Sequence, residues 1–207
     1  AATRLADQTW LCRHSTNFQV ILTDSTAAEG VLAVMGPNSR SLLSSVSSAD
    51  FSSQSNPFGT FQQIEIGLGL ARAHRISYVG ELGWEIYIST DQCGHVFEVL
   101  WEAAQNLEAK LCGMHVMDSC RIEKAYRHFG HDITCEDHIL EAGLGFAVKT
   151  EKEDFIGKEA VIRKKENGLE KRLMQFRLTD SEPLLYHNEP ILRNGEVVGY
   201  LSSGAYG

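Results

Sequence analysis

The sequence predicts an α+β fold in which helices pack on one face of a mainly antiparallel sheet. Residues 84–89 alternate Trp84, Ile86 and Ile88 with polar neighbours, which is the period of a half-buried strand. Residues 96–111 carry apolar side chains at helical spacing. The order strand, strand, helix, strands, helix along the chain is typical of this class.

The segments before residue 84 are expected to supply most of the sheet. The continuous apolar run over residues 30–36 predicts a central strand covered on both faces. Residues 36–39 end this strand and begin a helix over residues 39–46. The other elements expected here are a short helix starting near residue 7, a strand over residues 17–24, a surface loop over residues 47–59, and a hairpin whose strands, residues 61–66 and 70–77, flank residues 67–69.

A long helix is expected after the strand that contains Trp84. Thr90 or Asp91 is the predicted N-cap, the apolar spacing continues to residue 111, and Gly113 lies just past the predicted end. We interpret the Trp and Phe side chains of this stretch as core rather than as a platform for a ligand.

A second helix is expected over residues 115–128. Asp118 and Arg121 lie three positions apart on it and therefore share a face. One interpretation is an ion pair on a solvated face, which would contribute well under ~1 kcal/mol. The other directs Arg121 into a cleft, where its rigid fork of donors can hold an anionic or planar ligand.

The last part of the chain changes character. Residues 154–160 lead into a helix that reaches about residue 167, and the charged run after it is interpreted as a solvated face and a connector. From there the pattern is one of short strands, over residues 173–178 and around Asn194-Gly195, the strongest short hairpin signal. We therefore expect one domain over residues 1–168 and the start of an all-β domain over residues 169–207.

Composition limits the function. A chain of 207 residues with 43% hydrophobic and 9% aromatic residues can bury a sizeable core. The net charge of −8 disfavours nucleic acid and anionic membrane surfaces as partners. No apolar run approaches the length of a membrane span. The five cysteines are odd in number and lack CxxC spacing, which indicates reduced thiols in a cytoplasmic or mitochondrial matrix compartment.

A cluster of metal-ligating residue types follows the second predicted helix, but we predict no metal site there. Gly130 interrupts the regular presentation of the histidines, so capping and loop hydrogen bonds are the favoured roles. The residues concerned are His128, His131, Asp132, Cys135, Glu136, Asp137 and His138.

The stretch Gly80-Glu81-Leu82-Gly83 places a carboxylate between two glycines. Glycine allows positive φ and the close approach of a ligand to the backbone. A carboxylate on such a bend can accept two parallel hydrogen bonds from a planar pair of donors, such as a guanidinium, an amidine or the edge of an aminopterin ring. The alternative is an ordinary turn with a solvated Glu81.

These residues carry a resemblance to a known family. Residues 78–85 resemble the signature of the aminomethyltransferases, the folate-dependent T-protein of the glycine cleavage system and its relatives. Residues 121–124, 140–144 and 154–160 resemble the family's second, third and fourth motifs, and residues 194–204 the opening of its C-terminal β-barrel. The wording of the first two motifs is nearest the folate-binding region of dimethylglycine and sarcosine dehydrogenases.

The resemblance implies a tetrahydrofolate site. It assigns Glu81 to the aminopterin edge, Arg121 to the lining of the folate pocket, and Tyr78 to the same cofactor-binding set. In the dehydrogenase relatives an FAD domain oxidises a small N-methyl amine to an iminium, and the folate domain passes the one-carbon unit to tetrahydrofolate to give 5,10-methylenetetrahydrofolate. The resemblance places both the flavin domain and the catalytic aspartate upstream of Ala1, so neither Asp7 nor Asp24 is assigned that role.

We accordingly expect this chain to be part of a longer protein and to show no turnover alone. Two alternatives keep the fold but change the function. One is a regulatory module without chemistry, like the regulatory subunit of pyruvate dehydrogenase phosphatase. The other is a stand-alone T-protein or demethylase relative. The presence of Glu81 and Arg121 favours folate binding over the regulatory alternative.

Overall fold

A computed structural model describes residues 3–206 of the chain. Its internal contacts divide the chain into two units. Unit 1 comprises Ala1–Ser77 and Glu81–Leu111, and unit 2 comprises Tyr78–Gly80 and Cys112–Gly207. The division passes through the Gly-Glu-Leu-Gly bend, because Gly80 belongs to unit 2 and Glu81 to unit 1.

Unit 1 contains a four-stranded sheet in the order β1-β4-β3-β2, in which every neighbouring pair is antiparallel. The predicted hairpin is present, and its second strand ends at His74. The strands are β1 Glu29–Met35, β2 Phe61–Ile66, β3 Gly69–His74 and β4 Gly83–Ser89.

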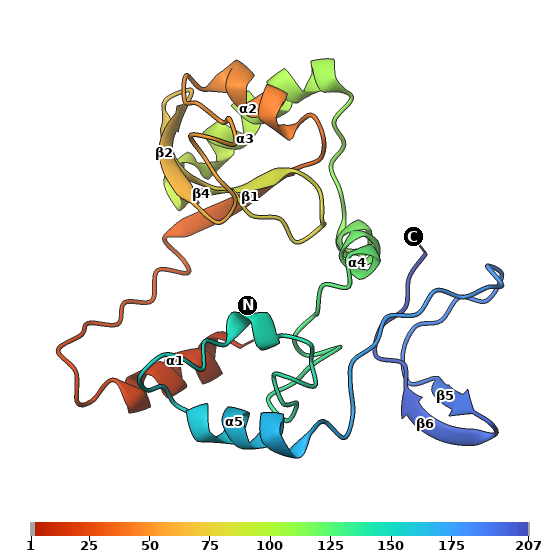
Figure 1. Ribbon diagram of the computed structural model, residues 1–207. Coiled ribbons are helices and arrows are strands. Elements are labelled where there is room, and N and C mark those ends of the chain that lie inside the picture. The colour runs from red at the N-terminus through yellow and green to blue at the C-terminus, as the bar shows by residue number, and fades with distance from the viewer. Residues whose placement is uncertain (1–2, 207) are drawn as a thin grey trace. The chain divides into compact units, whose positions relative to one another are not determined.

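Helices α2 (Ser39–Val46) and α3 (Thr90–Ala104) pack on one face of this sheet (Figure 1). Strand β4 lies between β1 and β3, and its Trp84, Ile86 and Ile88 are all buried beneath the helices. The predicted alternation in β4 is therefore confirmed, as is the α+β class with helices on one face of an antiparallel sheet.

The loop over residues 47–59 was expected at the surface, but two of its side chains lie in the core. Phe51 and Asn56 are each only 1% exposed. Phe51 meets the Trp84 ring edge to face at 5.6 Å, and the guanidinium groups of Arg40 and Arg75 lie 5.9 and 5.6 Å from the centre of the same indole. The sequence did not indicate these core contacts, because the loop is mostly polar and its few inward side chains form no periodic pattern.

Two predictions about the N-terminal strands are wrong. The apolar run forms β1, but β1 is an edge strand that pairs only with β4, and Val31 on its outer face is 48% exposed. Residues 17–24 form no strand, and Ile21 is 93% exposed. A strand requires a hydrogen-bonded partner, which this segment lacks within residues 3–206.

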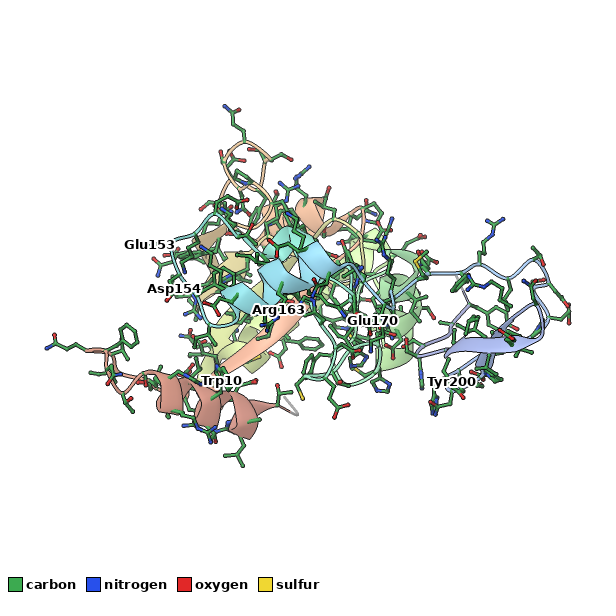
Figure 2. All side chains as sticks on the ribbon, turned by 60° about the horizontal axis from the view of Figure 1, so that its bottom comes forward. Trp10, Glu153, Asp154, Arg163, Glu170 and Tyr200 are labelled. Atoms are coloured by element: carbon green, nitrogen blue, oxygen red, sulfur yellow. The ribbon has the colours of Figure 1, made fainter. Side chains whose placement is uncertain are left out.

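The first helix, α1 (Arg4–His14), begins before the predicted position near residue 7. None of its described side chains is buried, and Trp10 is 51% exposed (Figure 2).

Helix α3 differs from its prediction at both ends. Its N-cap is Ser89 rather than Thr90 or Asp91, and it passes at Ala104 into the short 3₁₀ helix η1 (Gln105–Leu107). Val96, Leu100 and Ala104 form its buried side, whereas Phe97 is 36% exposed. The interpretation of the Trp and Phe side chains as core is therefore wrong for Phe97.

The first helix of unit 2 is α4 (Met114–Glu123), for which Gly113 is the N-cap. The helix was expected to reach residue 128, but Ala125 adopts φ +54° and ends the helical path. This early end matters for the site, because it places residues 125–132 in a loop that folds back on the helix.

Helix α5 (Lys158–Asn167) ends where the sequence predicts. Lys164 within the charged run is not simply solvated, because its ammonium lies 2.8 Å from the buried carboxylate of Glu141. A 3₁₀ turn, η2 (Gly145–Ala147), precedes α5.

The predicted hairpin near the end of the chain is confirmed. Strands β5 (Pro190–Arg193) and β6 (Glu196–Tyr200) are antiparallel, and Asn194 and Gly195 have φ values of 55° and 85°, as a tight I′-type turn requires. Residues 173–178 do not form the strand that their alternation predicts. Within residues 3–206, no helix combines the length and the apolar character needed to cross a membrane.

Candidate functional site

The two glycines of the Gly-Glu-Leu-Gly bend differ in what favours them, because only Gly80 has a positive φ. Gly80 has φ +74°, and a Cβ on it would overlap the side chain of Lys124. Gly83 begins β4, where a Cβ would overlap the sulfur of Met35. Neither position accepts a side chain without movement of the neighbouring Lys124 or Met35 side chain.

Glu81 itself is exposed. Its carboxylate makes no hydrogen bond or ion pair to any residue in the described range 3–206. A carboxylate without a protein partner keeps its acceptor capacity for a ligand. Glu81 is the only one of the three predicted site residues that lies in unit 1.

Tyr78, in unit 2, is half-buried and tied to the loop after α4. Its hydroxyl donates to the carbonyl of Arg127 at 2.8 Å, and its ring lies 6.1 Å from the ring of Tyr126 with an angle of 19° between the planes. Burial raises the pKa of the Tyr78 phenol, so the hydroxyl stays protonated and remains a donor.

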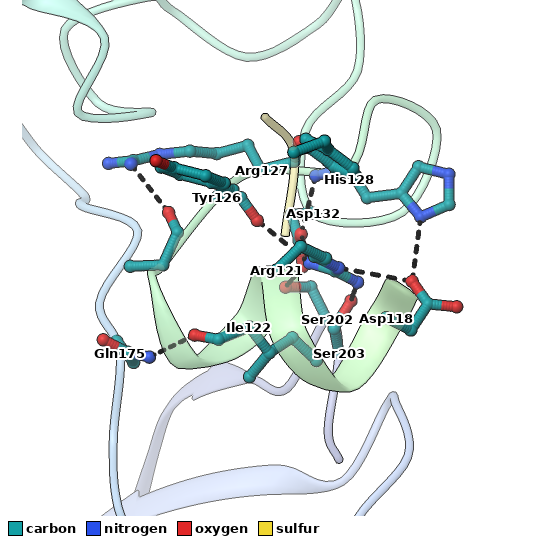
Figure 3. A network of polar contacts seen from close by, with 12 residues as sticks. Asp118, Arg121, Ile122, Tyr126, Arg127, His128, Asp132, Gln175, Ser202 and Ser203 are labelled. Carbon is teal, nitrogen blue, oxygen red and sulfur yellow. Dashed lines mark hydrogen bonds and ion pairs between the residues drawn. The ribbon is translucent and has the colours of Figure 1, made fainter. Parts of the chain in front are cut away.

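Arg121 is buried on α4 and is surrounded by protein acceptors (Figure 3). Its Nε donates to Asp118 Oδ1 at 3.3 Å, and its Nη2 donates to Ser203 Oγ at 2.9 Å. Its Nη1 donates to the carbonyl of Tyr126 at 3.2 Å and also to Asp132. The predicted pair with Asp118 exists, but Arg121 is buried rather than solvated, whereas the Asp118 side chain is 35% exposed.

Asp132 was considered in the sequence only among possible metal ligands, and not as a partner of Arg121. Its side chain is 8% exposed. One oxygen accepts from Arg121 and, at 2.9 Å, from the backbone N–H of His128, while the other accepts from Ser202 Oγ at 2.8 Å. No periodic signal links residues 121, 132 and 202, so spacing could not have found this contact.

Competing effects set the acidity of Asp132. Burial disfavours the charged form and acts to raise the pKa of the carboxyl group. Hydrogen bonds from Ser203, the His128 N–H and Ser202, together with the Arg121 charge, outweigh burial and hold the pKa of Asp132 below its ordinary value. The side chain is therefore ionised at neutral pH and forms a true ion pair with Arg121.

Arg127 organises the third motif, residues 140–144. Its Nε donates to the carbonyl of Ala142 at 2.8 Å, and its Nη2 donates to the carbonyl of Gly143 at 3.3 Å. Gly143 has φ +70°, and a Cβ there would overlap the Arg127 guanidinium. The glycine of this motif is thus required both by its backbone and by the arginine packed on it.

The histidine-rich segment shows no metal centre. His128 and His131 lie with ring centres 4.5 Å apart, and His128 Nδ1 is 3.6 Å from Asp118. Across residues 3–206, however, no group of three or more histidine, cysteine, aspartate or glutamate side chains is arranged to hold a metal ion.

Unit 2 also contains an open pocket of about 910 Å³ between the end of α4 and residues 170–206. Its lining combines apolar side chains such as Phe176 and Leu184 with cationic ones such as Arg127 and Arg177. This volume lies within the usual range for small-molecule sites. The mixture suits a ligand that has both a ring and negative charge.

Comparison with known protein families decides the assignment. Residues 1–152 match the GCVT N-terminal domain, and residues 171–207 match the glycine cleavage T-protein C-terminal barrel domain. The chain belongs to the glycine cleavage T-protein family. The resemblance seen in its motifs is therefore confirmed, and the C-terminal hairpin belongs to the start of the family's barrel domain.

Members of this family that resemble the chain include enzymes that act on N-methyl amines. A 4-methylaminobutanoate oxidase (formaldehyde-forming) of Paenarthrobacter nicotinovorans is 42% identical over 89% of this chain, which covers 22% of the oxidase. Human mitochondrial sarcosine dehydrogenase is 37% identical over 91% of the chain, which covers 21% of the enzyme. An aminomethyltransferase of Halothermothrix orenii is 36% identical over 96% of the chain, and here the chain spans 55% of the relative.

A solved structure shows the same fold in this family. The aminomethyltransferase T of the glycine cleavage system from Bartonella henselae superposes with a TM-score of 0.77 at 22% identity, covering 99% of this chain and 55% of that protein. The chain thus spans about a fifth of the oxidase and dehydrogenase relatives and about half of the aminomethyltransferases.

Proposed function

We propose that the chain is the tetrahydrofolate-binding part of an FAD-dependent N-methyl amine dehydrogenase of the dimethylglycine and sarcosine type. It would pass the one-carbon unit released from the amine to tetrahydrofolate, giving 5,10-methylenetetrahydrofolate. The observation that carries the proposal is Glu81, an exposed carboxylate without a protein partner in residues 3–206, which lies on a bend between Gly80, at φ +74°, and Gly83.

The carboxylate of Glu81 fits the edge of an aminopterin ring. The 2-amino group and the neighbouring ring nitrogen present two parallel N–H donors, and an ionised carboxylate presents two parallel acceptors. Hydrogen bonds to a charged group contribute about 1.5–3 kcal/mol. Tetrahydrofolate, when bound, supplies the nitrogens that accept the one-carbon unit.

Tyr78 and Arg121 complete the proposed binding set. Arg121 has all three of its nitrogens engaged by protein acceptors, so we assign it mainly to holding the end of α4 beside the pocket it lines. Tyr78 offers an aromatic ring fixed through its hydroxyl. The roles of all three residues rest on the family's motifs and on this geometry.

Oxidation of the amine is assigned to other parts of the whole protein. The chain spans only 21% of sarcosine dehydrogenase and 22% of the methylaminobutanoate oxidase. We infer that a flavin domain and the amine site lie in the remainder of such a protein, and that a small iminium is the species delivered to this domain. The separate family matches at residues 1–152 and 171–207 support our domain boundary near residue 168.

A stand-alone aminomethyltransferase is the second candidate, and the Halothermothrix orenii relative favours it. The protein encoded by the complete reading frame distinguishes the two. Bound flavin, detected by its visible absorption, supports the dehydrogenase. Turnover that requires an aminomethyl group on a lipoyl carrier supports the aminomethyltransferase.

Folate binding is tested by calorimetric titration of 5-formyltetrahydrofolate, a stable analogue, into the 207-residue chain and its variants. We expect Glu81→Ala to abolish binding, and Glu81→Gln to weaken it roughly 10- to 100-fold, because one acceptor becomes a donor that faces a donor. Glu65→Gln, on the exposed outer face of β2, is the matched control and should bind as the unchanged chain does. Equal affinity in all four proteins would remove Glu81 from the site.

A further inference from the structure

The buried pair of Arg121 and Asp132 holds both ends of one short segment, residues 126–128. At one end of the segment, Arg121 Nη1 donates to the carbonyl of Tyr126. At the other end, Asp132 accepts from the backbone N–H of His128. Arg127 lies between these two positions. The two side chains bond each other. Since their side chains are 4% and 8% exposed, neither charge can exchange its partner for water without a large change in the loop.

The same segment fixes Tyr78, which comes from a distant part of the sequence. The Tyr78 hydroxyl donates to the carbonyl of Arg127, the residue between the two held positions. The Tyr78 ring lies nearly parallel to that of Tyr126. Residues 126–128 therefore provide both the hydrogen-bond acceptor for the Tyr78 hydroxyl and the ring that packs against the Tyr78 ring. The position of the Tyr78 side chain depends on these residues.

The ion pair of Arg121 and Asp132 is also held by two serines from the stretch that follows β6. Ser202 donates to Asp132 and Ser203 accepts from Arg121. Ser202 is 70 positions from Asp132 in the sequence, and Ser203 is 82 positions from Arg121. The segment that carries Tyr126 is thus held against both α4 and the stretch that follows β6.

We propose that Asp132 is a positioning residue, and that it acts through Arg121 and residues 126–128 to place the Tyr78 and Tyr126 rings as one wall of the ligand site. This inference rests on the proposed folate function, and it adds Tyr126 as a ligand-facing ring. Tyr126 is suited to that role because its side chain is 37% exposed although its backbone is held on both sides. Binding sites lose affinity when the residues that support their contacts are removed.

The test combines two measurements on the full 207-residue chain. Tyrosines are labelled as 3-fluorotyrosine, and the resonances of Tyr78 and Tyr126 are assigned by fluorine NMR with Tyr78→Phe and Tyr126→Phe. Affinity for 5-formyltetrahydrofolate is then measured by calorimetry. Three variants are compared with the unchanged chain: Asp132→Ala, Asp132→Asn, and Asp137→Ala as the control.

Asp137 is a matched control because it is also an ion-paired aspartate of unit 2. Its partners are Lys171 at 2.8 Å and the N–H of Thr134 at 2.9 Å, and neither belongs to the tyrosine pair. Asp137→Ala should leave both tyrosine resonances and the affinity unchanged.

We expect Asp132→Ala to shift both resonances in the ligand-free protein and to weaken binding by about 10- to 100-fold. Asp132→Asn keeps an oxygen acceptor but loses the charge, so it should move both quantities in the same direction by less. If Asp132→Ala does not fold, Asp132→Asn alone provides the readout. Circular dichroism on each sample ensures that only folded protein is compared.

Two results would overturn the inference while the folate function stands. In one, the unchanged chain binds the analogue and the folded Asp132 variants bind it equally well. In the other, affinity falls but neither tyrosine resonance moves, which would show that Asp132 acts by another route. If the unchanged chain does not bind the analogue and Glu81 variants behave likewise, the proposed function fails and the inference fails with it.

Discussion

The guanidinium of Arg127 donates from Nη2 to the carbonyl of Gly143 at 3.3 Å, at the place where a side chain on that glycine would have to lie. Gly143 is held at φ +70°, a conformation that costs an L-residue roughly 1–2 kcal/mol. The third motif of the family therefore contains a glycine for two separate physical reasons.

We predict that Gly143→Ala lowers the free energy of unfolding by about 2–4 kcal/mol, from backbone strain together with displacement of Arg127. Urea denaturation gives this value. Gly130→Ala is the control, because Gly130 also has positive φ, at 93°, but has open space where its Cβ would be. It should lose only the strain, about 1 kcal/mol. An equal loss in both variants would show that the Arg127 contact contributes nothing.

Asn56 is predicted to stabilise unit 1 through the core tryptophan. Its side-chain oxygen accepts from the Trp84 indole N–H at 2.6 Å, and its amide donates to Thr60 at 2.9 Å. Asn56→Ala leaves the buried indole donor without a partner, so the free energy of unfolding should fall by about 1–3 kcal/mol in urea denaturation.

The control for Asn56 is Asn38→Ala. Asn38 is exposed and makes no side-chain capping bond to α2. Its substitution should change the free energy of unfolding by no more than about 0.5 kcal/mol. A comparable loss at both positions would argue that Asn56 matters only as a polar residue in a loop.

Acid should weaken the chain partly through Asp132. The folded state holds the pKa of this carboxyl below its ordinary value. Its contribution to stability is therefore fully present above the unfolded-state pKa of about 3.9, and is lost as the pH falls through the lower folded-state pKa. We predict that the unfolding free energies of the unchanged chain and Asp132→Asn differ most at neutral pH and converge in acid.

This convergence is measured by urea denaturation from neutral pH down to the acid limb. Other carboxylates with lowered pKa, such as Asp137, are common to both proteins and cancel in the difference. A difference that stays constant with pH would mean that the charge of Asp132 adds nothing to stability.

Gly94 is predicted to be a site of easy stabilisation. It lies inside α3, and nothing within 4 Å would meet an added Cβ. Gly94→Ala should raise the free energy of unfolding by about 0.5–1 kcal/mol, because alanine loses less backbone entropy in a helix. Thermal denaturation should show the higher midpoint.

Gly69→Ala should have the opposite effect. Gly69 is buried at the start of β3, where a Cβ would overlap Val96 and lie 3.3 Å from the carbonyl of Ile66. Crowding of this kind costs about 1–3 kcal/mol. A stabilised Gly69→Ala protein would contradict the packing of α3 on β3.

Local patterns predicted the parts of the fold that depend on local structure. The alternation around Trp84 and the Asn194-Gly195 turn fix strand and hairpin through neighbouring residues alone. The apolar segment over residues 17–24 resembles a strand in composition but forms none. A strand also needs a hydrogen-bonded partner, and the sequence of the segment alone does not show whether one is available. The edge position of β1 likewise depends on strand order.

In the candidate site too, local features could be predicted from the sequence, whereas long-range contacts could not. The motif around Glu81 could be found because its residues are consecutive. The spacing of Asp118 and Arg121 predicted their contact, but the stronger partners of Arg121 lie at Asp132 and Ser203. Those contacts form only because α4 ends early and the loop folds back, an event set by the positive φ of Ala125.

The buried indole at the centre of the unit 1 sheet gives the chain an internal optical reporter. Trp84 is fully enclosed and hydrogen-bonded, while Trp10 is half exposed and Trp101 only partly covered. With Trp10 and Trp101 replaced by Phe, the emission wavelength of the remaining tryptophan would follow the opening of this sheet alone. Melting of unit 1 could then be timed separately from events around α4 and the C-terminal hairpin.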